Sequence, residues 1–224
     1  MSRSKIFQNI LDNPQNTDQN IMFIGMSGAG KSHWSKEFSA RFNMPRVAYD
    51  HLIAGSEAFK KLIEGIEGDT LTQKMGNYFG MPWEGGFKEK EAAYLNLEDH
   101  LMMTHKPDGG HILDTTGSAI YCPEGLNNLK TNAITIYLET APEKYGDMLE
   151  EFKRTPKPVC WAGEYSQLEG EDHHDALSRC YEILLNTRHD LYQKFADVTI
   201  SCDIHKVIEN ADELVTHISK QLDQ

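Results

Sequence analysis

A glycine-rich loop between an apolar run and a helical pattern is the feature that most restricts the fold of this chain. The stretch is IMFIGMSGAGKSHW, residues 21–34. Its loop matches the spacing GxxxxGK[ST], with the fixed positions at Gly25, Gly30, Lys31 and Ser32. The apolar run is typical of a strand covered on both faces, and the aromatic residues that recur every four positions after the loop predict one face of a helix. The order of strand, loop and helix favours a phosphate-binding P-loop over a chance glycine-rich turn.

The chemistry expected of this loop follows from its backbone. Glycines lack a β-carbon, so successive N–H groups can turn towards one anion, and the following helix adds the positive end of its dipole. Lys31 is expected to reach the β- and γ-phosphates of ATP, and the Ser32 hydroxyl is expected to bind Mg²⁺. The residues predicted to bind the nucleotide are Gly25, Ser27, Gly28, Ala29, Gly30, Lys31, Ser32 and His33.

Composition narrows the classes of partner. The chain has 224 residues and a formal net charge of −12, which argues against a nucleic-acid surface or an anionic membrane as partner, because both attract clustered Lys and Arg. Its four cysteines are scattered without a CxxC pair, so free thiols in a reducing cytoplasm are expected. No apolar segment is long enough to span a bilayer, and the N-terminus lacks the apolar core of a signal peptide. The expected protein is soluble and cytoplasmic.

Strand and helix patterns alternate along the rest of the chain. Candidate strands lie at residues 46–50, 111–116, 133–139 and 198–201, with helical patterns between them. This alternation predicts an α/β fold, with a mostly parallel sheet and helices on both faces. Residues 1–20 combine a helix-like start with a polar run, and they are interpreted as a polar leader ahead of a single domain at residues 21–224.

Two acidic residues end candidate strands, at the sheet edge where ligands bind in α/β folds. Asp114 closes the pattern at 111–116 and is predicted to hold Mg²⁺ beside Ser32. Asp50 closes the pattern at 46–50 and is predicted to orient an acceptor hydroxyl and to take its proton. The alternatives are structural, with Asp114 as a turn former at the strand end and Asp50 as the N-cap of the next helix.

Several motifs occur in an order that resembles the shikimate kinase family of P-loop small-molecule kinases. They are GMSGAGKS in the loop, YDHLI at 49–53, GFKEKE at 86–91, ILDTTGSAI at 112–120, IYLET at 136–140 and RHDLYQKFADVTI at 188–200. The resemblance covers most of residues 20–222. It implies a P-loop NTPase three-layer fold with a five-stranded parallel sheet, a substrate-binding region at about 51–105 and a lid at about 154–173. It also implies transfer of the ATP γ-phosphoryl group, with Mg²⁺, to a hydroxyl of a small metabolite.

The resemblance also indicates which residues bind the acceptor, although some of them are altered in this chain. Arg188 matches a family arginine that binds the acid group of the acceptor. Lys88 replaces a second arginine, which keeps the charge but loses the bidentate geometry. Thr116, Gly117 and Ser118 stand where the family has three glycines. These departures leave the acceptor open among shikimate, sugar acids, polyols and cyclitols.

The metal site and the lid are further points of comparison with the family. Ala48 stands where the family has a metal-binding acid, which leaves Asp114 for that role. In the lid, Lys157 is predicted to stabilise the transferring phosphoryl group, and Arg154 is predicted to lie nearer the adenine or the phosphates. A solvated basic loop is the alternative for both cations.

Two other classes of function stay open from the sequence. The missing acid and the altered glycines also suit a nucleotide-binding regulator that has lost phosphoryl transfer. The enlarged insertions suit an NTP hydrolase whose motions act on a partner. A gluconate-kinase-like enzyme is a close variant of the kinase hypothesis, because that family has a similar glycine-rich loop.

Overall fold

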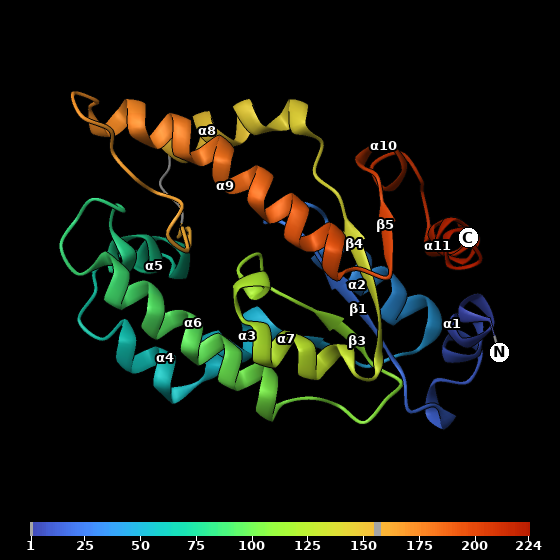
Figure 1. Ribbon diagram of the computed structural model, residues 1–224. Coiled ribbons are helices and arrows are strands. Elements are labelled where there is room, and N and C mark those ends of the chain that lie inside the picture. Colours follow the sequence, from blue (N-terminus) through green and yellow to red (C-terminus); the bar gives the residue numbers. More distant parts are fainter. Residues whose placement is uncertain (1, 155–157) are drawn as a thin grey trace.

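The computed structural model describes residues 2–154 and 158–224, and within these residues the central feature is a five-stranded parallel sheet (Figure 1). The strands are β1 (Asn20–Ile24), β2 (Arg46–Ala48), β3 (Ile112–Asp114), β4 (Ala133–Leu138) and β5 (Val198–Ile200). They lie in the order β2-β3-β1-β4-β5, and each neighbouring pair is parallel. The predicted α/β fold with five parallel strands is confirmed.

The central strand β1 is covered on both faces, as its continuous apolar sequence predicts. Its side chains alternate, so that Met22 and Ile24 join one apolar cluster while Ile21 and Phe23 join the other. Pairing of Phe23 with Asp114 aligns the end of β1 with the end of β3. The loop after β1 therefore leaves the middle of the sheet at the same edge as the residues that follow β3.

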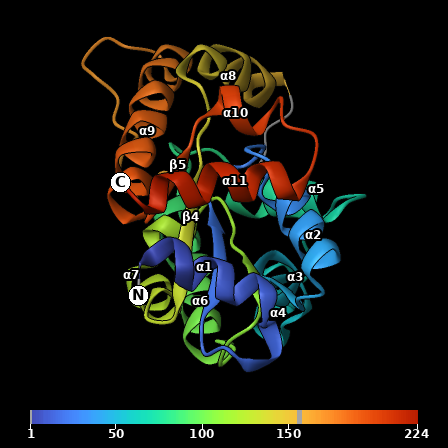
Figure 2. The same ribbon diagram turned by 90° about the vertical axis from the view of Figure 1, so that its right-hand side faces the viewer.

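Helices cover both faces of the sheet and complete three layers (Figures 1 and 2). On one face lie α1 (Arg3–Asp12), α2 (Lys31–Phe42) and α11 (Ala211–Leu222), and their apolar residues form one cluster with the strands. On the other face lie α6 (Phe87–Thr104), α7 (Pro123–Lys130) and α9 (His173–Phe195). The remaining helices are α3 (Tyr49–Gly55), α4 (Glu57–Leu62), α5 (Leu71–Phe79), α8 (Tyr145–Arg154) and α10 (Cys202–His205), and short 3-10 turns lie at η1 (Pro14–Asn16), η2 (Ala119–Tyr121) and η3 (Pro142–Lys144).

The first 20 residues contribute to the body of the domain instead of standing apart as a leader. Phe7 and Ile10 on α1 are fully buried, and they belong to the same apolar cluster as Leu214 and Ile218 of α11. Figure 2 shows α1 lying beside α11, with both chain ends on this face. The polar run after α1 hides this packing in the sequence, because only one face of a ten-residue helix carries the apolar side chains.

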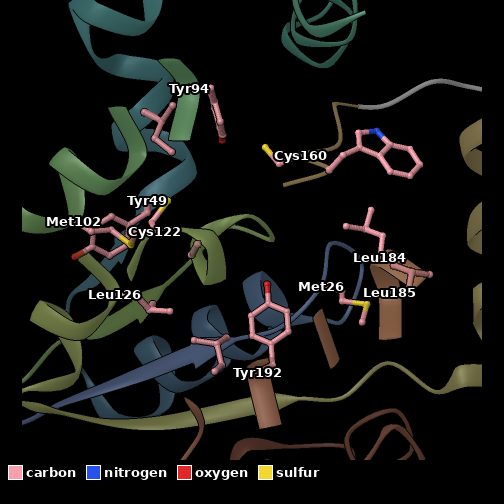
Figure 3. Packing of buried hydrophobic residues seen from close by; sticks show 14 of the residues in the cluster. Met26, Tyr49, Tyr94, Met102, Cys122, Leu126, Cys160, Leu184, Leu185 and Tyr192 are labelled. Atoms are coloured by element: carbon pink, nitrogen blue, oxygen red, sulfur yellow. The ribbon is translucent and has the colours of Figure 1, made fainter. Parts of the chain in front are cut away.

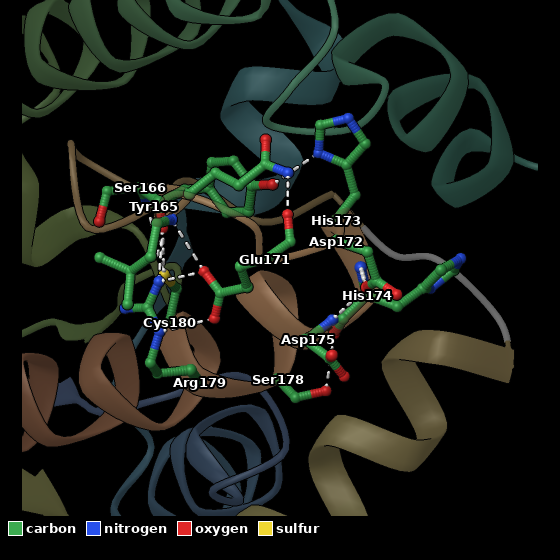
Figure 4. Close-up of polar contacts among 12 residues, drawn as sticks. Tyr165, Ser166, Glu171, Asp172, His173, His174, Asp175, Ser178, Arg179 and Cys180 are labelled. Carbon is green, nitrogen blue, oxygen red and sulfur yellow. Dashed lines mark hydrogen bonds and ion pairs between the residues drawn. The ribbon is translucent and has the colours of Figure 1, made fainter.

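The segment 158–172 lies between α6 and α9 and is attached to both. Glu91 on α6 accepts hydrogen bonds from the backbone N–H groups of Trp161 and Ala162. On the other side Arg179 of α9 forms an ion pair with Glu171, with 2.7 Å between Nη2 and Oε2 (Figure 4). Trp161 is buried against aromatic residues of α8 and α9, so it pins this segment to the body of the protein.

No helix in the described part of the chain is both long and apolar enough to cross a membrane.

Candidate active site

The loop after β1 has the geometry of a phosphate-binding loop. Gly25 has a φ of 144°, and a β-carbon there would lie 2.7 Å from the carbonyl oxygen of Leu138. Gly30 has a φ of 100° and caps α2, which begins at Lys31. Both positions require glycine, because a side chain would clash or strain the backbone. The loop thus delivers its N–H groups to the N-terminus of a twelve-residue helix.

Lys31 is held inside this loop. Its Nζ donates to the carbonyl oxygens of Gly25 at 2.7 Å and Met26 at 2.9 Å, and the residue is only 7% exposed. Burial lowers the pKa of Lys31 to about 8, although the Asp114 carboxylate and, more weakly, Asp50 act to raise it. The ammonium group is therefore charged at neutral pH and lies where the family motif predicts it.

A cavity of about 1060 Å³ joins the P-loop to the predicted acceptor residues. Its lining includes these residues predicted from the sequence: Ser27, Gly28, Ala29, Gly30, Lys31, Ser32, His33, Asp50, Thr116, Gly117, Ser118 and Arg188. Figure 3 shows part of its apolar wall, where Tyr94, Cys160 and Leu184 come from three separate segments. Such an enclosure suits a small ligand and limits the access of water.

Asp50 and Arg188, which are the predicted acceptor residues, both line the cavity. Strand β2 ends at Ala48, so Asp50 lies in the first turn of α3 and not at the end of the strand, as the sequence pattern suggested. Its carboxylate accepts a hydrogen bond from the N–H of His51. Arg188 is 7% exposed and donates to the Cys160 carbonyl oxygen at 2.6 Å and to the Tyr121 hydroxyl at 3.3 Å. Its guanidinium is thus fixed at the cavity wall.

The loop after β3 is held from two sides. The Tyr192 hydroxyl of α9 donates to the carbonyl oxygen of Gly117 at 2.8 Å. From α6, Glu98 accepts hydrogen bonds from the hydroxyls of Thr116 and Ser118. A β-carbon on Gly117 would lie 2.9 Å from the Ser27 nitrogen, so this loop also packs directly against the P-loop.

Asp114 is buried behind the P-loop, and its two carboxylate oxygens differ. Its Oδ2 is ion-paired with Arg46 and accepts from the Ser35 hydroxyl at 3.1 Å. Its Oδ1 is buried and has no hydrogen-bond partner among the described residues. A buried carboxylate oxygen without a partner suits a water or metal ligand, which agrees with the predicted role of Asp114, and Ser32, the other predicted ligand, lines the cavity.

Two of the predicted cations, Lys88 and Arg154, are not among the described residues that line the cavity. Lys88 is exposed in the first turn of α6, because Phe87 and Glu91 are the residues of that turn that face inwards. Arg154 is also exposed, and it pairs with Glu151 one helical turn earlier on α8. The predicted roles of these two residues are corrected accordingly. The predicted cation Lys157 lies outside the described residues.

The structure adds two residues that the sequence patterns did not select. Lys206 follows β5 at the same edge of the sheet, where its Nζ lies 3.4 Å from the Gly28 carbonyl oxygen and lines the cavity. Applying the sheet-edge rule to the fifth strand would have indicated it. Glu98 lies four residues after Tyr94, on the buried face of α6. An acid on the apolar face of a helix was the available signal.

A P-loop that opens into a cavity large enough for a second small ligand is typical of a P-loop phosphotransferase that acts on a small molecule. A family model described as shikimate kinase matches residues 27–222. The chain belongs to the shikimate kinase family. It is a small-molecule kinase that uses ATP and Mg²⁺.

Named relatives agree with this assignment. The shikimate kinase of Mannheimia succiniciproducens is 27% identical over 208 residues, which cover 92% of this chain and 95% of that protein. A shikimate kinase structure from Bacteroides thetaiotaomicron matches with a TM-score of 0.57 at 16% identity, over 92% of this chain and 99% of that one. The shikimate kinase of Acinetobacter baumannii in complex with shikimate gives 0.50 at 22% identity, over 96% and 94%. At these identities the two structures establish a shared fold.

Proposed function

We propose that this protein transfers the γ-phosphoryl group of ATP to a hydroxyl of a small metabolite bound between Asp50 and Arg188. The observation that carries the proposal is the single cavity, because it joins the P-loop to both acceptor residues. Phosphoryl transfer depends mainly on positioning and on neutralising charge, and a shared cavity brings donor and acceptor together for both purposes.

The nucleotide end supplies the cradle for ATP. Backbone N–H groups of the P-loop and the ammonium of Lys31 bind the phosphates, and Lys206 adds a second positive charge beside Gly28. Ser32 and Asp114 would hold Mg²⁺, which neutralises charge on the phosphates when it is bound. Lys157 remains our candidate for the cation that faces the transferring group.

At the acceptor end, the bound metabolite presents its hydroxyl to the γ-phosphoryl group. Asp50 orients that hydroxyl and takes its proton as the oxygen forms a bond to the γ-phosphorus. The bond from the γ-phosphorus to the bridging oxygen then breaks, and ADP leaves. Arg188 binds a polar or anionic group on the far side of the acceptor. Segment 158–172 carries Val159 and Cys160 on the cavity wall and serves as part of a lid that excludes water.

Shikimate belongs among the acceptors to test, because named relatives are shikimate kinases and one solved structure contains shikimate. Sugar acids, polyols and cyclitols belong there too, since Lys88 lies outside the cavity and side chains occupy the loop after β3. The net charge of −12 and the free thiols support a cytoplasmic enzyme that acts on small molecules without a nucleic-acid or membrane partner.

The test is ADP release with Mg²⁺·ATP across a panel of shikimate, sugar acids, polyols and cyclitols. We expect slow release without acceptor, stimulation by one class of compound, and loss of both rates in Lys31→Ala. In Asp50→Asn the acceptor-dependent rate should fall while ATP affinity stays the same. Tight ATP binding with no stimulation by any compound would favour the nucleotide-binding regulator.

A further inference from the structure

A fully buried serine lies on α2, one helical turn after the predicted metal ligand Ser32. Ser35 is 0% exposed. Its Oγ lies 3.1 Å from Oδ2 of Asp114 and 3.3 Å from the carbonyl oxygen of Ser32. Arg46 of β2 donates to the same Oγ through its Nε, at 2.8 Å. One hydroxyl therefore contacts both predicted metal ligands, Ser32 at its backbone and Asp114 at its carboxylate.

The hydrogen bonds around Ser35 close a ring of three side chains. A hydroxyl has one proton, and the Asp114 carboxylate is both the nearer and the charged acceptor, so Ser35 donates to Oδ2. Arg46 donates to the Ser35 oxygen with Nε and to Oδ2 of Asp114 with Nη2. The planar guanidinium thus holds the serine and the carboxylate together.

This ring fixes the rotation of the Asp114 carboxylate. Donors from two elements, α2 and β2, bind Oδ2, so the group cannot turn about its Cβ–Cγ bond without breaking both hydrogen bonds. Oδ1 is buried and has no hydrogen-bond partner among the described residues. A metal ion or a metal-bound water would use Oδ1, because Oδ2 is committed to two donors. The ring therefore determines where Oδ1 lies relative to the first turn of α2.

The sheet brings the members of this ring to one face, behind the P-loop. Ala48 pairs with Asp114 in the parallel register, so Arg46, two residues earlier on β2, points to the same face of the sheet. Asp114 also pairs with Phe23, which belongs to the apolar cluster under α2. Burial lowers the pKa of Lys31 to about 8 and the Asp114 charge opposes this, so the P-loop ammonium is within electrostatic reach of the ring.

We infer that Ser35 is a positioning residue for Mg²⁺, because it holds the Asp114 carboxylate at a fixed place relative to Ser32. Arg46 supports this role by binding both partners of the hydrogen bond between Ser35 and Asp114. Neither Ser35 nor Arg46 is among the described residues that line the cavity, so both act through Asp114. The inference rests on the Mg²⁺ role given to Asp114 in the proposed function and adds the residues that orient it.

Metal affinity tests Ser35 directly, in the complex of the protein with ADP. Mn²⁺ is the probe, and its EPR signal gives the concentration of the free ion. In Ser35→Ala the charges of Arg46 and Asp114 stay in place, and we expect the Kd of Mn²⁺ to rise by about tenfold. The affinity for ADP in EDTA should stay unchanged, whereas a merely structural role of Ser35 would weaken ADP binding with and without metal.

The matched control is Ser39→Ala. Ser39 lies one turn further along α2 and donates to the carbonyl oxygen of Met44 at 2.7 Å, so its loss should leave the Kd of Mn²⁺ unchanged. A folded Ser35→Ala protein with native Mn²⁺ affinity would overturn the inference. An equal loss of ADP affinity in EDTA would overturn it as well.

The double variant Ser35→Ala/Asp114→Asn tests whether Ser35 acts through Asp114. If it does, Ser35→Ala should cost less than about twofold in Mn²⁺ affinity in the Asp114→Asn background, because the two substitutions remove one shared interaction. A full tenfold loss in that background would contradict the inference. So would an Asp114→Asn protein that binds Mn²⁺ as tightly as the native chain.

Arg46→Lys gives a second test that does not depend on the folding of Ser35→Ala. Lysine keeps the positive charge but lacks the fork that donates to two oxygens, so we expect the Kd of Mn²⁺ to rise by about tenfold here too. Arg41→Lys is the control, because Arg41 donates to Asp212 in an exposed pair, and the Kd should stay the same. An unchanged Kd in Arg46→Lys would count against the ring and overturn the inference.

The acceptor panel separates this inference from the proposed function. If no compound stimulates ADP release while Mn²⁺ binding responds as expected, the proposed phosphoryl transfer fails and the role of Ser35 stands. If a compound is phosphorylated and Ser35→Ala binds Mn²⁺ like the native chain, the inference alone fails.

Discussion

Arg46 holds one oxygen of Asp114 in a buried ion pair, and the other oxygen is buried without a hydrogen-bond partner among the described residues. The two residues end up side by side because β2 and β3 are parallel neighbours, with Arg46 at the start of β2 and Asp114 at the end of β3. The long arginine side chain spans the length of the short strand. The side chains are 15% and 2% exposed. The pair fixes the orientation of the Asp114 carboxylate, which is our candidate Mg²⁺ ligand.

Removal of one partner of this ion pair should destabilise the folded protein strongly. Arg46→Ala leaves a buried carboxylate unpaired, which we expect to lower the free energy of unfolding by about 3 kcal/mol or more. Urea denaturation measures this change. Arg41→Ala is the control, since its pair with Asp212 is more than half exposed on both sides and should cost less than about 1 kcal/mol. If the two variants lost the same free energy of unfolding, burial would not increase the cost of breaking the Arg46 pair.

Asp114 should determine the Mg²⁺ requirement. In Asp114→Asn the carboxylate charge is lost while the amide keeps the shape, so we expect saturation with Mg²⁺ to need about tenfold more metal. Initial rates of ADP release over a Mg²⁺ titration give this value. An unaltered Mg²⁺ dependence in a folded variant would mean that the metal is held without Asp114.

Much of this arrangement follows from sequence patterns, and the exceptions have physical causes. The P-loop was identified because its glycines, lysine and serine stand at fixed spacings that the backbone itself requires. Asp50 was placed at the end of a strand because the apolar pattern continues into Tyr49, yet Tyr49 is a buried helix residue. Lys88 was assigned by its place in a motif, and motif position does not determine which face of a helix a residue occupies.

The pKa of Lys31 makes ATP binding depend on pH. The free protein carries the Lys31 charge below pH 8 and loses it as the pH rises, because burial lowers this pKa from 10.5 to about 8. We therefore expect ATP affinity to weaken from pH 7 to pH 9, as measured by calorimetry. Lys31→Arg should show no such change in this range, since arginine stays charged.

The same pKa has a consequence for the stability of the nucleotide-free protein. Between pH 8 and pH 10.5 the unfolded chain binds a proton at Lys31 that the folded protein lacks. The free energy of unfolding should therefore gain a positive contribution from Lys31 as the pH rises through this window. Lys31→Met should lose this contribution. If neither the ATP affinity nor the free energy of unfolding changed with pH in these windows, the result would contradict a lowered pKa of Lys31.

Gly117 should couple the acceptor loop to the nucleotide site. A β-carbon there would lie 2.9 Å from the Ser27 nitrogen, so Gly117→Ala must push the P-loop or its own loop aside. We expect a loss of about 1–3 kcal/mol in unfolding free energy, together with a raised Kd for ATP. Gly146→Ala is the control, because that glycine lies on α8 with open space around it, and alanine should be neutral or stabilising there.

The buried acids show where single-sequence reasoning stops. Glu98 is one of several acids on α6, and only the three-dimensional contacts reveal that it meets Thr116 and Ser118 across the space between two elements. Trp161 is a second example, because its burial against aromatic residues of α8 and α9 anchors segment 158–172. Long-range partners of this kind cannot be read from local periodicity, which reports only the face of an element.

The central claim is that the loop from Gly25 to Ser32 binds ATP in the same cavity that holds the acceptor. Isothermal titration calorimetry with a non-hydrolysable ATP analogue and Mg²⁺ tests it most directly, using the native chain and Lys31→Ala. We predict one nucleotide per chain for the native protein, with binding lost or strongly weakened in the variant. A folded native protein that takes up no nucleotide, or that binds it equally well without Lys31, would contradict the account.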